Sequence, residues 1–172
     1  MSIHPGGQPE SHVPQREELR LGRLAPGAAQ SCAELEAEIF VGDSPWSAQS
    51  FAAELATPTN LYLGLVDARD KVWAYAGLAK LGPDSDPEYE IRNIAVSPRL
   101  RRQGLGKLLM DHLMAVVEEQ PGPIFLEVRT DNVAAITMYE AYGFRKLGIR
   151  RNYYQESGAD AYTMECAYPR HE

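Results

Sequence analysis

Apolar residues recur along the chain with two different spacings, which predict its helices and strands. Where they recur every three or four residues, as at Leu109, Leu113, Val116 and Val117, one face of a helix is apolar. Elsewhere, short apolar runs are bounded by Gly, Pro, Asp and Ser, which is typical of strands. We expect strands at 18–24, 61–66, 72–81, 89–96, 124–128, 144–154 and 161–167, and helices at 28–41, 47–55, 105–120 and 132–142.

The resulting order of elements is β-α-α-β-β-β-α-β-α-β-β. It contains no internal repeat and no linker long enough to divide the chain, and 172 residues are the length of one domain. The Gly, Pro, Gln and His content of the first residues indicates a disordered leader, 1–17. We therefore expect one mixed α/β domain at 18–169 behind that leader.

Charge and composition narrow the classes of function. The formal net charge of −7 argues against broad binding to nucleic acid, which normally needs clustered Lys and Arg. The apolar stretches fall far short of the ~20 residues of a membrane span. The N-terminus has neither the basic start nor the apolar run of a secretory signal. We expect a cytoplasmic protein that binds neither membrane nor nucleic acid.

The cysteines and histidines give no metal-binding pattern. Cys32 and Cys166 are the two cysteines, and no second pair stands at ligand spacing. The four histidines are scattered along the chain. We expect both thiols to be reduced and buried, and we expect no metal.

A glycine-rich turn between a strand and a helix carries the clearest chemical signal. It reads Arg101-Arg102-Gln103-Gly104-Leu105-Gly106-Lys107. Unpaired N–H groups and the helix dipole favour a bound anion at such a position, and glycines let the backbone approach phosphate oxygens. Arg102 and Lys107 add positive charge. The turn predicts a pyrophosphate cradle, with a solvated basic turn that only caps the helix as the alternative.

Two other phosphate-binding loops do not match this turn. Lys107 is followed by Leu108 instead of Ser or Thr, which a nucleoside triphosphate loop requires. Leu109 stands where the dinucleotide fingerprint has its third glycine. The turn therefore fits neither ATP nor NAD.

The amino-acid sequence of the turn resembles a motif of a known superfamily. Arg101-x-x-Gly104-x-Gly106 is similar to the acetyl-CoA signature of the GNAT N-acetyltransferases, and Asn93-Ile94-Ala95-Val96 is similar to their splayed cofactor strand. The resemblance covers about residues 19–168, and it implies the GNAT fold with acetyl-CoA as cosubstrate. It implies that the pantetheine arm is held by Ile94, Ala95 and Val96, and the pyrophosphate by Arg102, Gln103, Gly104, Leu105, Gly106 and Lys107.

A more specific resemblance, to the RimI family, lies beyond the turn. It is carried by Leu126-Glu127-Val128-Arg129-x-x-Asn132-x-x-Ala135-Ile136-x-x-Tyr139-Glu140-x-x-Gly143-Phe144, by Ile149-Arg150-Arg151-Asn152-Tyr153-Tyr154 and Asp160-Ala161, and by Pro45-Trp46-Ser47. RimI enzymes acetylate the N-terminal alanine of small-subunit ribosomal protein eighteen. The resemblance implies the same reaction here, with the N-terminus of a ribosomal protein, before its assembly, as the partner.

Acetyl transfer needs a base for the amine and an acid for the departing thiolate. The resemblance implies that Glu127 is the base and Tyr139 the acid. It implies further that Asn132 binds the pantetheine amide and that Trp46, Tyr153 and Tyr154 line the peptide groove.

Each of these roles has a structural alternative. Glu127 alternates with apolar neighbours and so faces away from them, where it could be a solvated carboxylate paired with Arg129 or Arg145. Glu90 is then the reserve base. Tyr139 has the spacing of a core residue, the proposed pantetheine ligand is placed to cap a helix, and aromatic residues in strands are common as packing.

The acidity of amines favours an N-terminal substrate. At pH 7 an α-amine of pKa ~8 is neutral about a tenth of the time, whereas a lysine of pKa ~10.4 is neutral less than about one part in a thousand. The leading hypothesis is therefore a protein Nα-acetyltransferase. The alternatives are a lysine or small-amine acetyltransferase and a non-catalytic acyl-CoA sensor, which would need neither base nor acid.

Overall fold

The computed structural model describes residues 12–41 and 45–168, and its helices and strands follow the order that the apolar spacing predicts. Short 3-10 turns η1 (Arg16–Glu18), η2 (Pro26–Ala28) and η3 (Pro98–Leu100) lie between them. The strands are β1 (Arg20–Arg23), β2 (Asn60–Val66), β3 (Val72–Leu81), β4 (Glu88–Val96), β5 (Ile124–Arg129), β6 (Arg145–Tyr154) and β7 (Ala159–Cys166). The helices are α1 (Ala29–Ile39), α2 (Ala48–Ala56), α3 (Leu105–Glu119) and α4 (Val133–Ala141).

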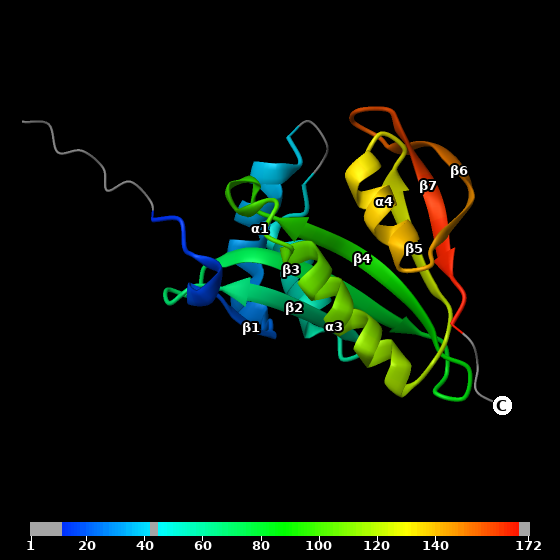
Figure 1. The fold of residues 1–172 in the computed structure, drawn as a ribbon, viewed down its shortest axis with the longest axis horizontal. Helices are drawn as coiled ribbons and strands as arrows, with labels where there is room; N and C mark the ends of the chain where they lie inside the picture. The colour runs from blue at the N-terminus through cyan, green and yellow to red at the C-terminus, as the bar shows by residue number, and fades with distance from the viewer. Residues whose placement is uncertain (1–11, 42–44, 169–172) are drawn as a thin grey trace, which may run out of the picture.

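The strands form one sheet in the order β1-β2-β3-β4-β5-β7-β6. β4 and β5 are parallel, and the other neighbouring strands are antiparallel. β4 and β5 pair only at Tyr89–Ile124 and Glu90–Phe125, after which β4 stays with β3 and β5 stays with β7. The sheet therefore opens between β4 and β5, whose ribbons diverge in Figure 1.

Two helical layers cover the sheet (Figure 1). α3 and α4 lie on one face, where Leu109, Leu113 and Ile136 belong to the larger core cluster. α1 and α2 lie on the other face, with Cys32 and Phe51 in a second core cluster. β3 is buried along most of its length because both of its faces are covered. Both faces of the sheet are thus covered by a packed layer at β3 and β4.

A β-bulge in β4 directs two successive side chains toward the layer of α1 and α2. The pairing with β3 skips one residue of β4, Arg92. Arg92 Nε lies 3.7 Å from a carboxylate oxygen of Glu54 on α2. Asn93 Nδ2 donates to Glu36 on α1 at 3.0 Å. The bulge therefore ties the start of the cofactor strand to both helices.

Glu36 is the centre of a buried polar cluster. Its side chain is 4% exposed, and it accepts hydrogen bonds from the Tyr75 hydroxyl, from Asn93 and, at 3.5 Å, from the backbone N–H of Trp46. Burial raises the pKa of the Glu36 carboxyl, although these three hydrogen bonds oppose the rise. Burial therefore disfavours the ionised form of Glu36 relative to an exposed glutamate.

Because the pKa of Glu36 is higher in the folded state, its contribution to stability is greatest below the ordinary glutamate pKa and is lost as pH rises through the folded value. We expect Glu36→Gln, which cannot ionise, to gain stability relative to the parent chain between pH 5 and pH 8. Each ~1 kcal/mol of this difference should appear as about 2–4 °C in Tm. Thermal unfolding of both chains at both pH values measures it, and parallel Tm curves would contradict it.

The ends of the chain are described in part. Of the leader expected at 1–17, residues 1–11 lie outside the described residues, and the boundary at residue 18 stays a prediction. Cys32 and Cys166 are both free and buried, as expected. None of the helices within 12–41 and 45–168 is long and apolar enough to span a membrane.

Candidate active site

The cofactor strand expected from the sequence borders the opening of the sheet. Ile94 and Val96 pack against the larger core cluster, whereas Ala95 lies in the second cluster. β4 ends at Val96, and Ser97 then caps η3 by accepting a hydrogen bond from the Arg99 N–H at 3.3 Å. The chain passes directly from the opening to the glycine-rich turn at the start of α3.

The glycine-rich turn exposes its backbone N–H groups. Arg102 and Gly104 have φ values of 65° and 72°, in the left-handed region, on either side of Gln103. Backbone that alternates in this way can direct successive N–H groups to one side and form an anion-binding concavity. Among the described residues, no protein group accepts a hydrogen bond from the N–H groups of residues 102–106. The turn therefore fits a diphosphate.

The side chains of the turn have different roles. Leu105 is 2% exposed and anchors the turn in the larger core cluster. Arg102 and Gln103 are exposed. Lys107 Nζ lies 3.1 Å from Asp111, so its charge is shared with a carboxylate one helical turn away. Any anion at this turn would therefore meet mainly backbone N–H groups.

We expect Gly104→Val to raise the Michaelis constant for acetyl-CoA about 10-fold, because a β-branched residue is strained at a φ of 72°. A Cβ at this position would meet only Arg16 Nη1, at 3.9 Å, so the strain of the backbone and not a clash is the cause. Steady-state kinetics at varied acetyl-CoA measure the effect. Gly22→Val is the control, because a Cβ at Gly22 has open space. If Gly104→Val folded and its Michaelis constant for acetyl-CoA were unchanged, the assignment of this turn to the pyrophosphate would be wrong.

Glu127 lies on β5, two residues beyond its last pair with β4. Leu126 and Val128 are buried in the larger core cluster, so the Glu127 side chain faces the other way, as the alternation predicts. One carboxylate oxygen accepts a hydrogen bond from the Thr163 hydroxyl at 2.8 Å, and the other lies 3.6 Å from Arg150 Nε. The side chain is 18% exposed. It is a carboxylate oriented by two strands that still reaches solvent.

β6 brings Tyr153 next to this carboxylate, with Tyr154 packed against the Tyr153 ring. The rings of Tyr153 and Tyr154 meet edge to face at 5.1 Å, and the Arg150 guanidinium lies 5.8 Å from the Tyr153 ring. Burial and the nearby Glu127 carboxylate raise the pKa of the Tyr153 phenol. Tyr153 is 41% exposed, so an apolar ring remains available beside Glu127.

Tyr139 is both a core residue and a candidate acid. It is 7% exposed, and its ring lies 5.7 Å from that of Phe144. Burial, with a smaller contribution from Tyr154, raises the pKa of its phenol, so the group keeps its proton at neutral pH. Within the described part of the chain, no group is hydrogen-bonded to this hydroxyl. Tyr139 thus packs in the core, as its alternative role predicts, and its hydroxyl can still donate a proton to a ligand.

The two arginines expected as alternative partners of Glu127 form ion pairs with other carboxylates. Arg129 lies 3.0 Å from Asp131, and Arg145 lies 3.4 Å from Glu165. The ion pair of Glu127 is formed instead with Arg150, which is 61% exposed, so the pair adds little to stability.

The remaining predicted residues lie at the ends of elements or on the second core cluster. Glu90, the reserve base, lies 3.1 Å from Arg92 Nη1. Asn132 caps α4 by accepting a hydrogen bond from the Ala135 N–H, as expected. Trp46 packs against Phe51 at 5.4 Å in the second cluster. The roles of all three toward ligands stay predictions.

Two side chains that shape the site were missed in the sequence. Thr163 orients Glu127 across β5 and β7, and Glu36 holds Asn93 on the cofactor strand. The signal for Thr163 is a polar residue in the alternating strand 159–166, and its partner depends on a strand pairing that local patterns do not encode. For Glu36, the signal is an acidic residue on the apolar face of a helix, next to Leu35.

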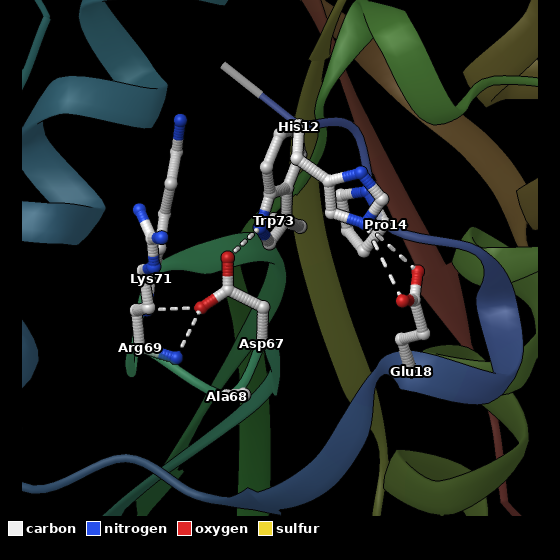
Figure 2. A pocket seen from close by; sticks show the side chains of 8 residues that line it. All are labelled: His12, Pro14, Glu18, Asp67, Ala68, Arg69, Lys71 and Trp73. Carbon is white, nitrogen blue, oxygen red and sulfur yellow. Dashed lines mark hydrogen bonds and ion pairs between the residues drawn. The ribbon is translucent and has the colours of Figure 1, made fainter. Parts of the chain in front are cut away.

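A cavity of about 340 Å³ lies apart from these residues, at the edge of the sheet. Figure 2 shows it between the N-terminal segment, with His12, Pro14 and Glu18, and the β2–β3 turn. Trp73 forms part of its wall and donates to Asp67 at 2.8 Å. None of the residues that line the cavity is a predicted site residue.

Comparison with known proteins gives consistent matches to one class of enzyme. The model of the acetyltransferase (GNAT) family matches residues 29–144. N-alpha-acetyltransferase RimI of Mycobacterium tuberculosis is 45% identical over 86% of this chain and 92% of its own length. The ribosomal protein bS18 alanine N-acetyltransferase of Escherichia coli K12 is 38% identical over 73% and 81%. A crystal structure of the ribosomal-protein-S18-alanine N-acetyltransferase from Escherichia coli superposes with a TM-score of 0.77 at 32% identity, covering 90% of this chain and 96% of that one.

Proposed function

Because the chain belongs to the GNAT acetyltransferase family and, within it, to the RimI family, we propose that it acetylates the N-terminal alanine of a small-subunit ribosomal protein of the bS18 type. The observation that carries this proposal is the Glu127 carboxylate, held by Thr163 and Arg150 at the opening between β4 and β5. A base at this point would meet an amine that approaches the opening from the side of α1 and α2.

The chain offers groups for each part of acetyl-CoA, which supplies the thioester that the amine attacks. The free N–H groups of residues 102–106 suit the diphosphate. β4 has no pairing with β5 beyond Glu90, so the backbone groups of Ile94 to Val96 that are not bonded to β3 suit the pantetheine arm, with the Val96 N–H near the thioester oxygen. Asn132 suits a pantetheine amide, since its cap uses one lone pair of its side-chain oxygen.

Two side chains suit the proton transfers. Glu127 takes a proton from the α-ammonium group, directly or through water, and the Tyr153 ring beside it lines the groove for the first residues of the peptide. Tyr139 gives its proton to the departing thiolate. Its raised pKa keeps it protonated at neutral pH, so it can serve as the acid.

The proposed substrate has a small residue, alanine, at its reactive end, and we propose that the reaction takes place in the cytoplasm. The ribosomal protein would meet the enzyme before assembly, while its N-terminus is free. A net charge of −7 suits a basic ribosomal peptide and does not suit nucleic acid. A lysine or small-amine acetyltransferase is the second candidate, because the same scaffold serves many amines.

The test compares two basic peptides as acceptors and follows the release of free thiol from acetyl-CoA. One begins with a free alanine, and its twin has a blocked N-terminus and a single lysine. We expect turnover with the first and almost none with the second. Preference for the blocked peptide would overturn N-terminal specificity. Binding of acetyl-CoA without turnover of any amine would identify a sensor instead.

A further inference from the structure

The segment that precedes the first strand reaches the coenzyme loop. Arg16, on η1, donates from Nη1 to the backbone carbonyl of Gln103 at 3.0 Å. The two residues are 87 positions apart in the sequence. The same nitrogen lies 3.9 Å from the place where a Cβ at Gly104 would stand. A guanidinium from the N-terminal segment thus sits against the peptide bond between Gln103 and Gly104.

This guanidinium is presented from an anchored turn. Pro14 is buried, and Gln15 and Glu18 form a reciprocal cap around η1. His12 lies 3.2 Å from Glu18. Figure 2 shows His12, Pro14 and Glu18 against Trp73 and the β2–β3 turn, where they form one side of the cavity. The anchored turn thus places the Arg16 guanidinium at the loop.

The geometry points to a role for Arg16 in coenzyme binding: we propose that it is a positioning residue, which holds the Gln103 carbonyl and so aims the Gly104 N–H at the coenzyme diphosphate. No peptide bond among the described residues is cis, so the carbonyl and the N–H of this peptide unit point in opposite directions. A donor that fixes the carbonyl therefore fixes the direction of the N–H. The proposal rests on the acetyl-CoA site of the proposed function.

The positive charge of Arg16 strengthens its effect on the Gly104 N–H. In the described part of the chain, no carboxylate is ion-paired with Arg16, whereas Lys107 shares its charge with Asp111. A hydrogen bond from a cation polarises the peptide unit, which makes its N–H a stronger donor to an anion. The positive charge also raises the local potential at the loop. Arg16 acts through the backbone and does not contact the reacting atoms.

The test measures the binding of CoA and of dephospho-CoA, which keeps the diphosphate, by titration calorimetry on the full chain. We expect Arg16→Ala to weaken both by about 5- to 20-fold, as for one hydrogen bond made by a charged donor, and Arg16→Lys to recover part of the loss. Arg20→Ala is the matched control, because Arg20 is an exposed arginine at the start of β1 that pairs with Asp70 at 3.0 Å. It should leave both affinities within about twofold.

A second readout separates positioning from general damage. With S-acetyl-pantetheine, which lacks the phosphates, kcat/KM of Arg16→Ala should equal that of the parent chain, and kcat with saturating acetyl-CoA should also be unchanged. Equal affinity of Arg16→Ala for CoA would overturn the proposal, as would an equal loss with the phosphate-free donor. If the parent chain bound no CoA, the proposed function itself would fail, which is a different result from a normal parent with a normal variant.

Discussion

Replacing Glu127 by Gln is expected to lower kcat/KM by about 10²- to 10⁴-fold at neutral pH, the range for loss of a positioned general base. The variant keeps the size of the side chain, and its carbonyl oxygen can still accept the hydrogen bond from Thr163. The ion pair with Arg150 is lost, but that arginine is exposed, so stability should change little. Peptide acetylation by the purified variant measures the effect.

The pH dependence of this variant reports which amine is attacked. Near pH 9 an α-amine of pKa ~8 is already mostly neutral, so part of the lost rate should return. A lysine acceptor of pKa ~10.4 would recover far less at that pH. Glu90→Gln is the matched control, since it removes the other carboxylate at the opening and should retain most activity. If Glu127→Gln kept the parental kcat/KM and Glu90→Gln lost most of it, the base would be Glu90.

Much of the fold could be predicted because each element carries a local signal. Val72–Leu81 has the bounds expected, since turn residues stop it at both ends. α3 ends at Glu119, just before the Pro-Gly-Pro run that the sequence shows. α1 is shorter than expected, since it ends at Ile39 where Phe40 leaves the helical region at a ψ of 59°. Ends without a proline or glycine are the ones that the sequence places least well.

The pairings between distant strands could not be predicted in the same way. β7 inserts between β5 and β6, so Thr163 meets Glu127 across 36 residues of chain. The bulge at Arg92 likewise depends on pairing with β3. The roles given to Glu127, Tyr139 and Asn132 rested on family resemblance, because a charged strand residue, a helical tyrosine and a cap residue have common structural uses. The structure adds the contacts that each of these side chains makes.

Removing the Tyr139 hydroxyl is expected to slow turnover by about 10²-fold or more while leaving the affinity for CoA nearly unchanged. Tyr139→Phe keeps the ring against Phe144, and no hydrogen bond among the described residues is lost with the hydroxyl. Stability should therefore be almost unaffected. Calorimetric CoA binding, Tm and single-turnover acetylation together measure the three quantities.

A control variant and the pH dependence of the rate test whether Tyr139 acts as the acid. Tyr89→Phe also removes a hydroxyl from a buried tyrosine, but one that donates to the Gln120 carbonyl at 2.6 Å, so it should cost some stability and little turnover. Because burial raises the pKa of Tyr139, its phenol stays protonated at pH 9, so the acid remains intact where the Glu127→Gln rate is expected to recover. The chain that carries both substitutions should therefore still recover toward pH 9, but at a rate that is lower at every pH by the factor measured for Tyr139→Phe alone. If Tyr139→Phe turned over at the parental rate, the tyrosine would be a core residue alone, and the proton of the departing thiolate would come from water.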